Sequence, residues 1–249
     1  MLGLLAELEK ADEEAMSLYL PVGLPLQDIE ILVEKVTPAQ AVAPDIINLA
    51  AHSPTGSALL WGTSRKCLVL PPFPFTERYI APGYDIEPLG SLLEHDFSIA
   101  LVLVRSGAYS IGVCQGEKIV SSKTGTGLIH ARHRKGGSSQ RRFERRREEQ
   151  MHAFLERVCG HVHQQLEPYA TSLDYLVYGG SRTAISSLQK QCPFLQQFES
   201  RTLPPLLNIP APRRKVLESA VVDIWSSMVT EWHDDTFPDI DSHPKGGLT

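Results

Sequence analysis

The residues whose types could do chemistry lie near the middle of the chain, where a glutamine follows glycines and serines. The run is Gly136, Gly137, Ser138 and Ser139, with Gln140 directly after it. Short side chains allow a backbone to enter a narrow crevice that a helix cannot enter. A carboxamide is no general base near neutral pH, but it donates and accepts hydrogen bonds at once. This stretch therefore predicts a loop that delivers Gln140 into a narrow crevice, where its carboxamide can form hydrogen bonds.

Positive charge is concentrated around this glutamine. The net charge is −5, yet residues 123–147 hold nine Lys or Arg residues against the single acid Glu144, a local charge of +8. An exposed helix start with pairs such as Arg145 to Glu149 is the alternative interpretation, but it does not account for the cations beside the glycines. Because guanidinium groups match phosphate geometry, we expect RNA binding. The expected contacts are Lys123, Arg132, His133, Arg134, Lys135, Arg141, Arg142, Arg145 and Arg146.

The sequence also contains partial matches to nucleotide-binding, β-lactamase and metal-binding patterns, and none of them is complete. The segment KTGTG at 123–127 is neither a GxxxxGK[ST] phosphate loop nor a complete GxGxxG fingerprint. Its KTG precedes the SxxK at 187–190, the reverse of the serine β-lactamase order. His161 and His163 stand two residues apart, so on a helix they face different sides and do not clamp one metal ion. We expect no metal and no cofactor.

The elements around the cationic stretch follow a regular order. Three strands in an antiparallel meander precede it, and a long helix begins near Gln140 and ends by Pro168, with apolar residues three or four apart. A buried strand and a helix capped by Ser181 come next. The strands are expected at 97–105, 108–114, 118–122 and 173–178, and the second helix at 181–190. This β-β-β-α-β-α order predicts an α/β (α+β) fold with a mixed sheet.

The expected organisation has four parts. An N-terminal extension contains a helix over 2–17, a second helix over 26–34, two short strands at 58–61 and 66–70, and an irregular proline-rich segment. A C-terminal part contains a connector over 203–212 and a helix over 213–232 that packs on the core. The boundaries are 1–94 for the extension, 95–200 for the catalytic domain with its glutamine loop at 123–142, 201–233 for the C-terminal helix and 234–249 for a disordered tail.

Cysteine spacing and hydropathy indicate a cytosolic protein. The four cysteines, Cys67, Cys114, Cys159 and Cys192, form no CxxC pair, which favours reduced thiols and no disulfide. The longest apolar run, Ile99 to Val104, falls far short of the ~20 residues that span a bilayer. We therefore expect a cytoplasmic protein with no membrane partner.

The segment KTGTGLIHARHRKGGSSQRRFERRREEQ, residues 123–150, resembles the glutamine loop of the peptidyl-tRNA hydrolases of ribosome quality control, and specifically their bacterial branch. These release-factor-like proteins are related to the central domain of the eukaryotic and archaeal peptide-chain release factor, which has a ribonuclease-H-like topology. The resemblance implies that Gln140 is catalytic and that residues 136–139 shape its approach. It also implies two partners, the large ribosomal subunit and peptidyl-tRNA. Because the loop has a Gly-x-x-Gln form and no codon-reading domain is recognised, codon-independent release is implied.

Two other classes of function remain open. One is a non-catalytic ribosome-binding or RNA-binding factor that the basic loop anchors. The other is an RNA nuclease, because the strand order is similar to that of ribonuclease-H-like folds. Metal-dependent cleavage needs clustered carboxylates, and Asp96, Glu117 and Asp174 are scattered singly along the chain, which disfavours the nuclease.

Overall fold

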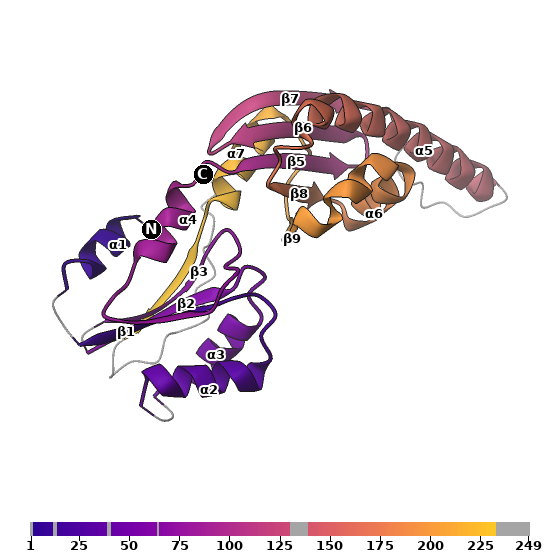
Figure 1. The fold of residues 1–249 in the computed structure, drawn as a ribbon. Helices are drawn as coiled ribbons and strands as arrows, with labels where there is room; N and C mark the ends of the chain where they lie inside the picture. The colour runs from indigo at the N-terminus through magenta and orange to yellow at the C-terminus, as the bar shows by residue number, and fades with distance from the viewer. Residues whose placement is uncertain (1, 12–13, 39–40, 64, 130–138, 233–249) are drawn as a thin grey trace, which may run out of the picture. The chain divides into compact units, whose positions relative to one another are not determined.

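The computed structural model describes residues 2–11, 14–38, 41–63, 65–129 and 139–232. The described residues form two compact units, one within 2–94 and 226–232 and the other within 95–225 (Figure 1). The tail predicted over 234–249 lies outside the described residues. Each unit contains a five-stranded sheet. Among the described residues, no helix is both long enough and apolar enough to cross a bilayer.

The first unit is a sheet with helices on both faces. Its elements are α1 (Leu2–Leu8), β1 (Ala15–Leu20), α2 (Leu26–Val36), α3 (Pro44–Ala51), β2 (Ser57–Gly62), β3 (Lys66–Leu70), β4 (Tyr79–Pro82), α4 (Glu87–Glu94) and β10 (Met228–Trp232). The strands pair antiparallel in the order β10-β3-β2-β1-β4. Successive side chains of a strand face opposite sides, so Leu59 packs with α2 and α3 whereas Leu60 packs with α1 and α4. Both faces are covered, which explains why β2 is apolar almost throughout.

The second unit contains the glutamine. Its elements are β5 (Ser98–Arg105), β6 (Ala108–Gln115), β7 (Lys118–Thr126), α5 (Ser139–Leu166), η1 (Glu167–Tyr169), β8 (Tyr175–Gly180), α6 (Arg182–Gln191), η2 (Pro193–Arg201), β9 (Thr202–Leu207) and α7 (Arg214–Ile224), where η marks a 3-10 helix. The sheet order is β7-β6-β5-β8-β9, antiparallel from β7 to β5 and parallel from β5 to β9. The predicted mixed α/β class and β-β-β-α-β-α order are confirmed.

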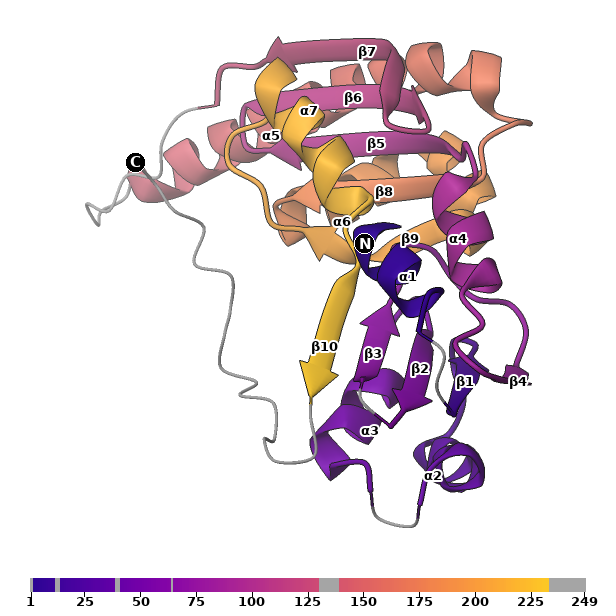
Figure 2. The same cartoon turned by 90° about the vertical axis from the view of Figure 1, so that its left-hand side faces the viewer.

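Helices cover both faces of this second sheet. Helices α5 and α6 lie on one face and α7 on the other (Figure 2). Leu217 of α7 packs against Gly112 of β6, whereas Val102 and Val113 belong to the core beneath α5 and α6. The predicted apolar face of the long helix lies in that core, with the fully buried residues Phe154, Leu155, Val158, Val162 and Leu166 and the partly buried Met151.

The prediction of a C-terminal helix over 213–232 is wrong for its second half. Helix α7 ends at Ile224, and Met228–Trp232 forms strand β10 against β3. The segment contains Val229 and Thr230, whose β-branched side chains suit a strand. Pairing with β3, which is distant in the sequence, therefore decides its structure.

The expected proline-rich connector over 203–212 contains strand β9, which lies at the sheet edge parallel to β8. The Pro204–Pro205 peptide bond is cis. Prolines are tolerated on an edge strand because the missing N–H removes no bond that a neighbouring strand needs. The two adjacent prolines therefore led to the prediction of an irregular connector, whereas pairing with β8 makes this segment a strand.

The N-terminal extension is also more regular than expected. The helix predicted over 2–17 ends at Leu8, and the alternating residues from Ala15 form β1. Helices α3 and α4 were not expected, and β4 lies in the segment predicted to be irregular. The helix predicted at 26–34 and the strands at 58–61 and 66–70 match α2, β2 and β3.

Cys159 and Cys192 form a disulfide, which corrects the prediction of reduced thiols. Cys159 lies on α5 and Cys192 directly follows α6, with a Cα–Cα distance of 5.4 Å. The pair was not predictable because 33 residues separate the two positions, and only the packing of α5 against α6 brings them together. Cys67 and Cys114 are free and buried, and burial raises the pKa of each thiol to about 12.

Candidate functional site

Helix α5 is longer than the sheet that it covers. Its 28 residues extend for about 42 Å. The buried residues begin at Phe154, and Ser139 lies about 22 Å before it along the helix axis. Residues 142–146 are all exposed, and the first part of α5 extends past the strands (Figure 1). The helix therefore carries its N-terminus well away from the core.

The structure places the predicted site residues in three groups. Lys123 is exposed on β7, and Arg142, Arg145 and Arg146 are exposed on α5. The first turn of α5 contains Ser139, Gln140 and Arg141, whose side chains lie outside the described part of the chain. The remaining predicted residues lie outside the described residues altogether, namely Arg132, His133, Arg134, Lys135, Gly136, Gly137 and Ser138.

The exposed arginines of α5 form one stripe. Arg142, Arg145 and Arg146 are three and four residues apart, a spacing that places them on one side of a helix. Arg145 Nε donates to Glu149 Oε1 at 3.1 Å, but both side chains are largely exposed, so the pair contributes little. Arg142 and Arg146 form no ion pair with any residue that the structure describes. Two of the three guanidinium groups are thus available to a phosphate.

The start of α5 offers backbone donors as well as arginines. The first four N–H groups of an α-helix have no carbonyl acceptor within the helix, and Gln140 is the second residue of α5. The first turn contains no acidic residue. Positive side chains here add to the positive end of the helix dipole instead of compensating it. This end of the helix is therefore an electropositive position that favours an anion.

The KTGTG segment has a structural role at the base of the glutamine loop. The N–H of Gly127 donates to the carbonyl of Gly107 at 2.9 Å, just after β7. A Cβ at Gly127 would clash with the Phe154 ring and would lie 3.0 Å from Arg157 Nη2. Only a residue without a side chain fits this closely against α5, so Gly127 fixes where the chain leaves the sheet.

Arg157 is a cation that the sequence analysis did not single out. It is exposed on α5, and its position eleven residues after Arg146 continues the arginine stripe along the helix. It also lowers the pKa of Tyr109, against the larger effect of burial, which raises it. The eleven-residue spacing is the signal in the sequence that indicates it, although Arg157 lies beyond the cationic stretch of residues 123–147.

The two helix histidines have separate neighbours, as their spacing predicted. The His161 ring stacks on Tyr109 at 5.4 Å between centroids. His163 Nδ1 lies 3.3 Å from Glu167 Oε2, and its ring contacts Phe194. Within the described residues, no three His, Cys, Asp or Glu side chains are grouped to hold a metal ion.

The second unit thus combines a mixed sheet with a long helix whose first turn contains a glutamine that arginines follow. Residues 98–230 match the family model of the Actinobacteria/chloroflexi VLRF1 release factor, which is more than half of the chain. The chain belongs to this family.

The chain is also similar to archaeal peptide chain release factors. It is 26% identical over 195 residues to peptide chain release factor subunit 1 of Aeropyrum pernix, covering 67% of this chain and 52% of the relative. The corresponding protein of Saccharolobus solfataricus is 24% identical over 236 residues, or 83% of this chain and 64% of the relative. The chain thus spans between half and two thirds of these relatives. A crystal structure of the archaeal translation termination factor aRF1 has 20% identity and a TM-score of 0.42, covering 90% of this chain and 68% of that one.

Proposed function

We propose that the protein is a codon-independent peptidyl-tRNA hydrolase that releases nascent chains from tRNA on stalled large ribosomal subunits in the cytoplasm. The observation that carries the proposal is the position of Gln140, which lies in the first turn of a helix whose exposed half is rich in arginine. Membership of a release-factor family supports the general task. The spacing Gly136-Gly137-Ser138-Ser139-Gln140 supports the codon-independent form.

The reaction is hydrolysis of the ester between the peptide and the 3′-terminal ribose of the tRNA. Water attacks the carbonyl carbon, the bond to the ribose oxygen breaks, and that oxygen takes up a proton as the peptide leaves as an acid. Gln140 holds the water with its side chain, or stabilises the developing oxyanion with a backbone N–H that lacks a helical acceptor. Because a carboxamide does not take up the proton, RNA groups or solvent accept it from the water.

The arginines hold the RNA while Gln140 acts. Arg142 and Arg146 reach phosphates from the same face of α5, and the predicted contacts of Lys123 and of the cations before Gln140 add to them. The length of α5 beyond the core lets its N-terminus enter a crevice of the subunit. Because residues 136–139 have small side chains, the segment that must enter this crevice beside Gln140 is narrow.

The test uses isolated large-subunit complexes that carry a labelled peptidyl-tRNA. The intact protein is expected to release the peptide, and Gln140→Ala is expected to bind the subunit without releasing it. Glu156→Gln, an exposed change on the same helix, is the matched control and should release the peptide normally.

Other outcomes of the same experiment identify the rival functions. Binding by the intact protein without release contradicts the proposal and indicates an RNA-anchoring factor. Shortened ribosomal RNA after incubation with magnesium contradicts it in favour of a nuclease.

A further inference from the structure

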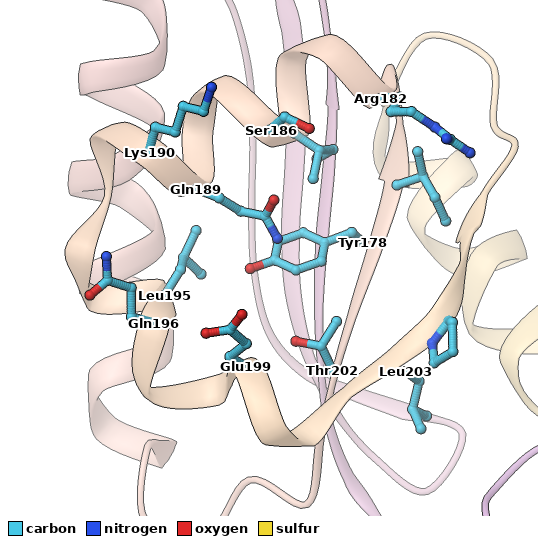
Figure 3. Close-up of a pocket in the computed structure, with 13 residues that line it drawn as sticks. Tyr178, Arg182, Ser186, Gln189, Lys190, Leu195, Gln196, Glu199, Thr202 and Leu203 are labelled. Atoms are coloured by element: carbon cyan, nitrogen blue, oxygen red, sulfur yellow. The ribbon is translucent and has the colours of Figure 1, made fainter. Parts of the chain in front are cut away.

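A pocket of about 790 Å³ lies in the second unit, on the side of α6, η2 and β9 (Figure 3). Its volume falls within the range of small-ligand sites. It is lined by residues of β8, α6, η2 and β9. No step of the proposed hydrolysis uses these residues.

One rim of the pocket is cationic. It is formed by α6, which places Arg182 and Lys190 at its two ends with Ser186 between them (Figure 3). Helix α6 contains no acidic residue. Arg182 and Lys190 are exposed, and neither forms an ion pair with a residue that the structure describes. This rim therefore suits an anionic ligand group.

The opposite rim and the floor supply hydrogen-bonding groups. Glu199 and Gln196 project from η2, and Glu199 and Gln189 lie on either side of the hydroxyl end of Tyr178 (Figure 3). Tyr178 is buried, and burial raises the pKa of its hydroxyl, while a hydrogen bond with Gln189 opposes the shift. Glu199 is exposed and accepts hydrogen bonds only. Apolar side chains, including Leu195 and Leu203, line the wall between the rims.

The order of these groups matches one chemical class of ligand. A ribonucleotide has a phosphate at one end, a ribose with hydroxyl groups in the middle, and a flat base whose faces pack on apolar side chains and whose edge carries hydrogen-bonding groups. A guanine edge presents an N–H and an amino group together, so a carboxylate accepts two hydrogen bonds from it. Uracil offers one N–H between two carbonyl oxygens, which a carboxylate repels. The prolines of β9 disfavour the alternative of a peptide strand added at this edge, because two positions lack the N–H.

We propose that this pocket binds an unpaired guanine nucleotide of RNA, with Arg182 and Lys190 on the phosphates and Glu199 on the base edge. The proposal rests on the proposed function only in taking RNA as the partner. It gives the protein a base-reading contact in addition to the phosphate contacts of α5.

The test measures binding of the trinucleotides UGU, UAU, UCU and UUU to the full chain by calorimetry. UGU is expected to bind about tenfold more tightly than UUU, because charge-assisted hydrogen bonds discriminate by roughly this factor. Glu199→Gln should reduce the preference to about twofold or less, since its amide no longer accepts both donors. Changing Arg182 and Lys190 together to Gln should weaken all four RNAs by a similar factor. Glu156→Gln on α5 is the matched control and should leave the preference intact.

Three results would overturn the proposal. They are equal binding of the four trinucleotides, a guanine preference that survives Glu199→Gln, and tighter binding of the acetylated and amidated tripeptide Glu-Leu-Lys than of UGU, which would indicate a protein partner. Since no reaction is measured, the result is independent of peptide release. Gln140→Ala is expected to keep the guanine preference even if the hydrolase proposal fails.

Discussion

The two halves of α5 have the same secondary structure but different surroundings. The half from Met151 to Leu166 packs on the sheet of the second unit, and its apolar face is fully buried. The half from Ser139 to Gln150 carries exposed arginines and has the glutamine in its first turn. The C-terminal half is stabilised by its packing on the sheet. The N-terminal half extends that helix by further turns.

This difference separates stability from function along one helix. Positive charge at a helix N-terminus is unfavourable, so the exposed half would be a poor helix by itself. Because the exposed half is continuous with the buried half, it stays helical and keeps the arginines at a fixed spacing, although it packs on no hydrophobic core. Substitutions in the two halves should therefore affect different quantities.

The largest effect on stability is expected for the buried half. Phe154→Ala should lower the free energy of unfolding by about 3–5 kcal/mol, because it removes a fully buried ring and leaves a cavity. Urea unfolding followed by circular dichroism measures the change. Arg146→Ala, in the exposed half, should change it by less than about 0.5 kcal/mol. Similar losses for both variants would contradict the comparison.

The disulfide should stabilise the buried half by a similar amount. Opening the Cys159–Cys192 link frees a loop of 33 residues, and loss of that restraint in the unfolded chain corresponds to about 3–4 kcal/mol. Urea midpoints with and without reductant measure it. A variant with Cys159→Ala and Cys192→Ala should not respond to reductant. A wild-type midpoint that is also unaffected by reductant would show that the link contributes nothing.

A smaller loss is expected at the base of the loop. Gly127→Ala places a methyl group against the Phe154 ring and should destabilise the second unit by about 1–3 kcal/mol. Gly160→Ala is the matched control, because it lies within α5 with no atom within 4 Å of the added carbon. That change should stabilise the helix by about 0.5–1 kcal/mol. Thermal unfolding separates the two, and equal effects would exclude close packing at Gly127.

The smallest effect on stability is expected for the arginine stripe. Changing Arg142, Arg145 and Arg146 together to Gln should alter the unfolding free energy by no more than about 0.5 kcal/mol, since among the described residues these arginines form one ion pair, which is exposed. RNA affinity should nevertheless fall, and the slope of log affinity against log salt should decrease by about 2. Fluorescence titrations at several salt concentrations measure the slope. An unchanged slope would show that these arginines do not contact phosphates.

Periodic, locally determined features of the fold were predictable from the sequence. The spacing from Phe154 to Leu166 gave the buried face of α5, and the turns at Ser106-Gly107 and Gln115-Gly116-Glu117 gave the meander. Ser181 caps α6 as expected, accepting from the N–H of Ala184. These features depend on neighbours in the sequence.

Features that depend on distant pairing were not predictable. Strand β10 exists because β3 offers it an edge, and β9 exists because β8 does, despite two prolines. The Cys159–Cys192 link requires α5 and α6 to pack together. The same holds for the pocket, whose residues come from β8, α6, η2 and β9 and share no motif. In the candidate site, charge and spacing identified the arginines up to Arg146 and a helix start near Gln140, whereas the contact of Arg157 with the base of the loop at Gly127 came only from the structure.

The most direct test of the separation between anchoring and chemistry is the rate of peptide release from large-subunit complexes as a function of protein concentration. For the variant in which Arg142, Arg145 and Arg146 are all Gln, the account predicts a higher half-saturating concentration with the same plateau rate. For Gln140→Ala it predicts an unchanged half-saturating concentration of subunit binding with no release at the plateau. A full plateau rate for Gln140→Ala would contradict the account, because the glutamine would then have no part in the reaction.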